Sequence, residues 1–102
     1  MIGKFEELVL LALVRAGPNS NAAKVYSVMD RRIEKVPQFA ALYTALDRLS
    51  RKGLITERDS DAAAGRPRRL FTISGEGRRA LDEAINASRA LMTIEGAATY
   101  NV

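Results

Sequence analysis

The spacing of hydrophobic residues along the chain is helical up to Gly53, strand-like from there to Ser74, and helical again afterwards. Apolar residues three and four positions apart are typical of amphipathic helices. They predict three helices in the first half of the chain, over Lys4–Ala16, Ala22–Lys35 and Gln38–Lys52. Proline follows the first two of these segments closely, and the residue before a proline avoids the helical conformation, so each helix is expected to end there.

Two short β-compatible runs follow, over residues 54–59 and 68–73, and the loop between them contains glycine. Such a pair predicts a β-hairpin. Ser74 is expected to cap a last helix that runs to about Ile94. The predicted fold class is therefore mainly α with a small β-hairpin, in the order of a winged helix-turn-helix domain with three helices and a two-stranded wing. Three parts are expected: a DNA-binding domain over 1–74, a C-terminal dimerisation helix over 75–95 and a flexible tail over 96–102.

The 102-residue chain has no cysteine and no histidine. These absences exclude a disulfide framework, thiol catalysis, a Ser-His-Asp triad and any His-ligated metal. The sequence also lacks a phosphate-cradling loop and a cluster of metal ligands, so we expect neither an enzyme nor a cofactor. Its longest apolar run, Leu8–Val14, is far shorter than the roughly 20 residues of a membrane-spanning helix. We therefore expect a soluble, cytoplasmic protein.

The third predicted helix has two distinct faces. Its apolar stripe consists of Phe39, Leu42, Leu46 and Leu49. At 100° per residue, the opposite face carries Ala41, Thr44, Arg48 and Arg51. Small side chains near the start of such a helix allow close approach to base edges in the major groove of DNA, whereas cations further along can reach phosphates. The predicted DNA contacts from this helix are Gln38, Ala41, Tyr43, Thr44, Arg48, Arg51 and Lys52.

The hairpin loop supplies the second predicted DNA contact, because it is rich in arginine. Arg66, Arg68 and Arg69 lie beside Gly65 and Pro67, and a stiff cationic tip of this kind can follow the DNA backbone or enter a narrow minor groove. Between Arg48 and Arg69 the sequence holds seven cations and three acids, a net charge of +4 that equals the net charge of the whole chain. The basic charge is thus concentrated where this fold would place its DNA surface.

The first and last helices indicate a second subunit. A chain this short buries only about two-thirds of its unfolded surface. The first helix is apolar on most sides, and the last helix carries a stripe longer than one small core can cover. The predicted homodimer interface consists of Phe5, Leu8, Val9, Leu81, Ile85, Ser88 and Met92. In the alternative, the stripe of the last helix packs within its own chain.

Three stretches of the sequence resemble the PadR family of bacterial transcriptional regulators, in its short form. They are Gly3–Leu13, then Ala41–Leu49 with Lys52–Ile55, and last Gly65–Ser74 with Gly77–Leu81. The resemblance implies a homodimer joined through its first and last helices, a roughly palindromic operator, and repression as the usual output. It also implies that Tyr43 and its neighbours face the DNA groove and that Arg66–Arg69 form the wing.

Several alternatives stay open on the sequence alone. Tyr43 can equally pack half-buried at the edge of the stripe, and Asp47 can pair with Arg51 one helical turn away. Relatives that respond to phenolic acids or bulky drugs imply a small hydrophobic or aromatic effector. A pocket for it between the two subunits would be lined by Phe5, Val9, Ile85, Leu91 and Met92, which interface packing explains as well. The alternative function is a winged-helix protein-interaction adaptor without specific DNA binding.

Overall fold

The computed structural model describes residues 2–60 and 68–92. Within these ranges the elements are α1 (Lys4–Ala16), α2 (Ala22–Asp30), α3 (Phe39–Arg51), β1 (Ile55–Asp59), β2 (Arg69–Ile73) and α4 (Gly75–Met92). The order and the mainly α class agree with the prediction. The expected tail over 96–102, and Arg66 in the expected wing tip, lie outside the described residues.

Local capping explains where the helices begin and end. The Asn21 side chain accepts a hydrogen bond from the backbone N–H of Lys24 at 2.8 Å, which starts α2. Ser74 does the same for α4, because its Oγ accepts from the N–H of Gly77 at 3.0 Å. After α3, Gly53 takes the left-handed conformation with φ +76°, where glycine is favoured.

The second helix is shorter than predicted, since it ends at Asp30 rather than at Lys35. The backbone N–H groups of Arg32 and Ile33 both donate to the carbonyl of Met29, which closes the helix in a tight turn. The chain then runs non-helically to Pro37, whose ring disfavours helix in the residue before it. Ile33 and Val36 still pack against the core from this connection, so the apolar spacing that extended the predicted helix is satisfied by a loop.

The hairpin pairs β1 with β2 in antiparallel register, with Ile55 opposite Ile73 and Asp59 opposite Arg69. A third segment joins it, because Ser20 in the turn before α2 exchanges two backbone hydrogen bonds with Phe71, at 3.0 and 2.8 Å. This bridge ties the base of the hairpin to the helical body, which matters because a two-stranded hairpin is marginally stable alone.

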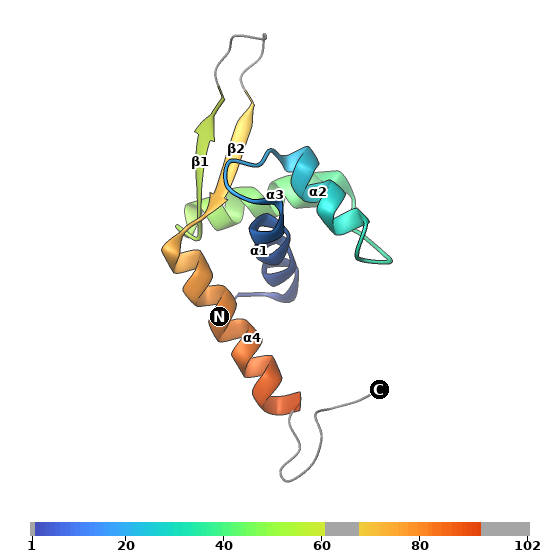
Figure 1. Ribbon diagram of the computed structural model, residues 1–102, viewed down its shortest axis with the longest axis vertical. Coiled ribbons are helices and arrows are strands. Elements are labelled where there is room, and N and C mark those ends of the chain that lie inside the picture. Colours follow the sequence, from blue (N-terminus) through green and yellow to red (C-terminus); the bar gives the residue numbers. More distant parts are fainter. Residues whose placement is uncertain (1, 61–67, 93–102) are drawn as a thin grey trace.

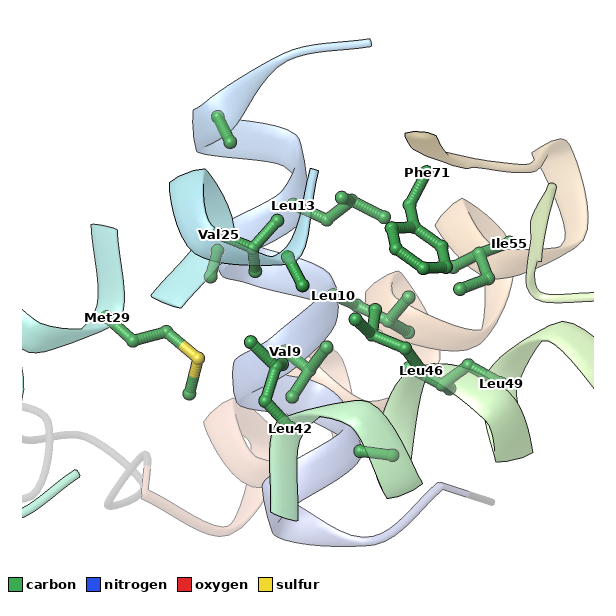
Figure 2. Packing of buried hydrophobic residues seen from close by; sticks show 14 of the residues in the cluster. Val9, Leu10, Leu13, Val25, Met29, Leu42, Leu46, Leu49, Ile55 and Phe71 are labelled. Carbon is green, nitrogen blue, oxygen red and sulfur yellow. The ribbon is translucent and has the colours of Figure 1, made fainter. Parts of the chain in front are cut away.

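The core lies where α1, α2, α3 and the base of the hairpin meet. Leu10, Leu13, Leu46 and Phe71 point toward one another from three elements in Figure 2, and all are almost fully buried. The helix α4 adds only Gly77, Leu81 and Ala84 to the buried residues. Figure 1 shows the hairpin and α4 projecting from the helical body in opposite directions. The hairpin and α4 are therefore two separate extensions of the helical body.

Candidate nucleic-acid interface

The helix α3 buries one side and exposes the other, as the sequence predicts. Leu42, Ala45, Leu46 and Leu49 are buried, whereas Ala40, Thr44, Asp47, Arg48 and Arg51 are exposed. Ala41 is half-buried beside this exposed face, and Gln38 caps the helix without a side-chain hydrogen bond to it. The Thr44 hydroxyl donates to the carbonyl of Ala40 at 3.2 Å, which fixes its rotamer and leaves its oxygen open to solvent. The exposed face thus runs from small side chains to cations along the helix.

Three aromatic rings fix the beginning of α3 against α2. The Tyr26 and Phe39 ring centroids lie 5.2 Å apart, and so do those of Phe39 and Tyr43, both pairs in edge-to-face geometry. The Tyr26 hydroxyl also donates to the Pro37 carbonyl at 2.8 Å. Phe39 differs from the expected apolar stripe, because 39% of its surface is exposed. Phe39 is the first residue of α3, and the buried residues of this helix begin only at Leu42.

Tyr43 is half-buried and packed on both sides. The edge of Phe39 lies on one side, and the guanidinium carbon of Arg69 lies 5.6 Å from the Tyr43 ring centroid. Of the two roles open to Tyr43 from the sequence, this environment favours packing at the edge of the core. It leaves part of the ring on the same surface as Thr44.

Arg69 joins the hairpin to α3 through two carboxylates. Its Nε donates to Glu57 at 2.6 Å, and its Nη2 donates to Asp47 at 2.6 Å and to Glu57 at 3.0 Å. These hydrogen bonds raise the pKa of the Arg69 guanidinium above its ordinary value, with Glu57 the larger cause, and they lower the pKa of the Glu57 carboxyl. Asp47 therefore pairs with Arg69 of the hairpin. The spacing along the helix had suggested Arg51 as its partner instead.

The remaining predicted cations divide into paired and unpaired groups. The Lys52 ammonium donates to the buried carboxylate of Glu6 at 2.8 Å, so its charge is paired inside the protein. Arg48, Arg51 and Arg68 are exposed, and none of them forms an ion pair with another residue in 2–60 or 68–92. Arg51 also lines a groove of about 350 Å³, together with Thr44, Asp47, Ser50 and Glu57. The free positive charge thus borders the exposed face of α3 and the described end of the hairpin.

Sequence reasoning missed the residues that hold the hairpin in place. Arg58 on β1 donates through Nε to the Asn19 side chain at 3.0 Å, and Ser20 pairs with β2 as described above. Asn19 and Ser20 lie between α1 and α2, in a segment whose sequence is typical of a simple turn. Asn19 has a positive φ of 55°, a conformation that asparagine tolerates better than most residues. In the sequence, the polar run Asn19-Ser20-Asn21 indicates only a turn and a helix cap. It gives no sign that Asn19 and Ser20 contact the hairpin.

The predicted dimer residues fall into two groups. Val9 and Leu81 are buried in the core of their own chain, with 0% and 5% of their surface exposed, so they leave little surface for a partner. Phe5, Leu8 and Ile85 are half-buried, whereas Ser88 and Met92 are exposed. Leu91 is 90% exposed at the end of α4, and Leu11 and Val14 on the outer side of α1 are also exposed. Sequence periodicity did not separate these two sides of α1, since both are apolar.

An apolar groove of about 370 Å³ lies between α1 and α2. Its apolar lining includes Leu8, Leu11, Val14, Val28 and Met29, and Arg15 and Arg32 also line it. None of the five residues of the predicted effector pocket lines this groove, and Val9 is too deeply buried to line any exposed pocket. The hydrophobic hollow therefore lies on the outer side of α1.

Neither a metal-ligand cluster nor a membrane-spanning helix occurs in the described part of the chain. No three Asp or Glu side chains of residues 2–60 and 68–92 gather where they could hold a metal ion. Among the described helices, none is long and apolar enough to span a bilayer.

Comparison with known proteins places this geometry in a family. The sequence profile described as "Transcriptional regulator PadR-like family" matches residues 10–83. Among curated proteins, none is significantly similar to the chain in sequence. The fold is similar to that of a PadR family transcription regulator from hypervirulent Clostridium difficile, with a TM-score of 0.75 and 21% identity over 87% of this chain and 91% of that one.

Two other solved structures share the fold. A PadR family transcriptional regulator from Eggerthella lenta is 27% identical, with a TM-score of 0.67 over 82% of this chain and 73% of that one. A winged-helix DNA-binding protein from STIV is 16% identical, with a TM-score of 0.69 over 89% of this chain and 94% of that one. The described residues form four helices and a two-stranded wing, and this architecture is that of winged-helix proteins.

Proposed function

The chain belongs to the transcriptional regulator PadR-like family, and from that premise we propose that it binds double-stranded DNA and represses transcription. It has no role as an enzyme, since the family is one of transcriptional regulators. In this proposal a homodimer acts in the bacterial cytoplasm, where it occupies a palindromic operator and hinders RNA polymerase. A small hydrophobic effector releases it.

The exposed face of α3 is the observation that carries the proposal. Thr44 lies near the beginning of this face, and Arg48 and Arg51, which have no ion-pair partner among the described residues, follow one and two turns later. A helix of this kind can enter the major groove with its small side chains toward base edges and its cations toward phosphates. Arg68, at the described end of the hairpin, supplies a further cation for the DNA backbone, and Arg66 belongs to the same proposed wing.

The proposed homodimer is supported by exposed apolar side chains on α1 and α4. Leu91 is 90% exposed and Met92 44% exposed on α4, while Leu11 and Val14 expose more than a third of their surface on α1. Exposed large apolar side chains on two helices favour association with a second copy of the chain. A two-fold dimer would present two α3 helices to half-sites about one helical turn apart.

The apolar groove between α1 and α2 is the proposed effector site. Its lining is mainly aliphatic, and Arg15 and Arg32 add positive charge that suits a hydrophobic ligand with an acidic group. The groove adjoins Leu11 and Val14, which belong to the proposed dimer surface. A ligand there would therefore alter how the two subunits meet.

Footprinting on DNA upstream of the protein's own gene tests the proposal. We expect two protected segments whose centres lie about one helical turn apart, related by two-fold symmetry. Addition of the protein to an in vitro transcription reaction from the same DNA should reduce the transcript. Protection without symmetry would reject the dimeric operator, and unchanged or increased transcript would reject repression.

A gel shift with random duplex at low salt separates this proposal from a protein-interaction adaptor. A DNA-binding regulator shifts random duplex weakly through phosphate contacts, and specific duplex more strongly. An adaptor leaves both unshifted. Titration of hydrophobic acids into the operator complex then tests the effector site, and release that is lost in Leu11→Asp would support it.

A further inference from the structure

Arg69 is one of the arginines predicted to contact DNA from the wing, yet three hydrogen bonds tie its partly exposed guanidinium to Glu57 and Asp47. We propose that Arg69 is a positioning residue that locks the hairpin to α3 and makes no phosphate contact. This inference rests on the proposed DNA binding for its effect on affinity. Its structural part, the lock between hairpin and helix, can be tested without DNA.

The geometry uses both edges of the guanidinium fork. Nε and Nη2 hold the two oxygens of Glu57 on β1 at 2.6 and 3.0 Å, while Nη2 also reaches Asp47 on α3 at 2.6 Å. Both ion pairs are short, and charge-assisted hydrogen bonds of this length are the strong ones. One side chain on β2 thus joins three elements that are separate in sequence.

Packing holds the guanidinium in the same place. Its carbon lies 5.2 Å from the Phe71 ring centroid and 5.6 Å from that of Tyr43, within the range of cation–π contact. Phe71 follows Arg69 by two positions and shares its face of the strand, which points toward the core. Arg68 directly precedes the strand and is exposed.

The charge balance argues against a phosphate at this point. Three of the five guanidinium N–H groups already serve two carboxylates, and Arg69 with Asp47 and Glu57 carries a net charge of −1, which repels a phosphate. The neighbouring Arg68 carries an unpaired charge among the described residues. Consecutive arginines of the wing therefore have different tasks, since Arg68 can meet DNA while Arg69 sets where the wing stands relative to α3.

The test with DNA compares matched variants of these neighbours. Lysine keeps the charge but cannot bridge two carboxylates as the planar fork does. We expect Arg69→Lys to weaken operator binding about tenfold, as the loss of charge-assisted hydrogen bonds suggests, with the salt dependence unchanged. Arg68→Lys should bind as the wild type does, and Arg68→Ala should lower the slope of log K against log salt by about 0.9 per lost phosphate contact.

The substitution Asp47→Ala should change DNA affinity in opposite directions, depending on whether Arg69 contacts a phosphate or holds the hairpin against α3. It removes a negative charge from an exposed position on α3, so a phosphate-contacting Arg69 would be freed and affinity would rise. If Arg69 is the lock, affinity falls by several fold because the link to α3 is gone. Wild-type affinity in Arg69→Lys, or a gain in Asp47→Ala, would overturn the proposal.

Amide hydrogen exchange without DNA tests the lock itself. In both Arg69→Lys and Asp47→Ala, amides of β1 and β2 should exchange at least about fivefold faster, while those of α1 keep wild-type rates. Arg68→Ala is the control and should leave exchange in β1 and β2 unchanged. If wild-type protein bound no duplex, the proposed function would fail while this result still stood. Unchanged exchange in both lock variants would reject the lock even if DNA binding were established.

Discussion

The Lys52 ammonium donates to the buried carboxylate of Glu6 at 2.8 Å, and this pair joins the first turn of α1 to the end of α3. The other oxygen of Glu6 accepts from the backbone N–H of Gly3 at 3.0 Å, so the same side chain caps α1. Both hydrogen bonds favour the ionised carboxyl and lower the pKa of Glu6, with the bond from Lys52 the larger cause. Lys52, a predicted phosphate contact, thus joins the end of α3 to α1 through Glu6.

Glu6→Gln should destabilise the fold in a pH-dependent way. Because the pKa of Glu6 is lowered from 4.5 on folding, its ionised form stabilises the native state above that pH, and the gain is lost as pH falls through the lowered value. We expect a loss of about 1–2 kcal/mol at neutral pH, between the values of exposed and buried pairs. Urea unfolding at pH 7 and pH 3 should show this difference shrinking in acid, with Glu7→Gln as the control.

Gly77 lies where α4 approaches the connection between α3 and β1. A Cβ at this position would overlap the carbonyl oxygen of Leu54, a backbone atom that cannot turn away. Gly77→Ala should therefore lower the free energy of unfolding by about 1–3 kcal/mol or more, as in overpacked cores. Gly75→Ala is the matched control, since only the end of the Arg79 side chain lies near its Cβ, at 3.9 Å. Equal melting temperatures for the two variants would contradict this packing.

The elements of the fold were predictable from local pattern. The spacing of Leu42, Leu46 and Leu49, with Gly53 behind them, defines α3 to within a residue at each end, and Ser74 marks the beginning of α4. Local rules fail where a distant contact competes with them. The second helix ends early because its last predicted apolar residues can pack from a loop that leads to Pro37.

The candidate site was predictable in its exposed half only. Thr44, Arg48 and Arg51 follow from helical periodicity. The partner of Asp47 could not be predicted from periodicity. In the sequence, Arg51 one turn away and Arg69, 22 positions away, are equally suitable cations. Only the fold brings β2 beside α3, and the same holds for Ser20 and Phe71. The two sides of α1 could not be told apart, since both consist of aliphatic residues.

Thr44 and Arg48 should affect DNA binding in different ways. Thr44→Ala removes a hydroxyl near the beginning of α3 and should change base preference at one position of each half-site, with the salt slope unchanged. Arg48→Ala should weaken binding to all sequences alike and flatten the slope. Competition assays with single-base operator variants at two salt concentrations distinguish the two effects. An equal loss across all sequences in Thr44→Ala would remove it from the base-reading surface.

Leu91 should matter for assembly and little for the fold of one chain. It is 90% exposed, so Leu91→Asp leaves intrachain packing intact. Burial of a leucine at an interface is worth about 1.5–3 kcal/mol per chain, so we expect the dimer dissociation constant to rise at least tenfold. Sedimentation equilibrium measures this constant, with Ala90→Asp, also exposed, as the matched control. A monomeric wild type, or a dimer that Leu91→Asp leaves unchanged, would contradict the proposed interface.

The salt dependence of binding to DNA upstream of the protein's own gene tests the central claim most directly. Each neutralised phosphate releases counterions, so log K should fall linearly with log salt concentration at about 0.9 per contact. With Arg48, Arg51 and Arg68 from both subunits in contact, the expected slope is about −5. Fluorescence anisotropy between about 50 and 200 mM salt would measure it. A slope near −5 supports a dimer that binds through α3 and the wing, and a slope near zero would contradict DNA binding by this surface.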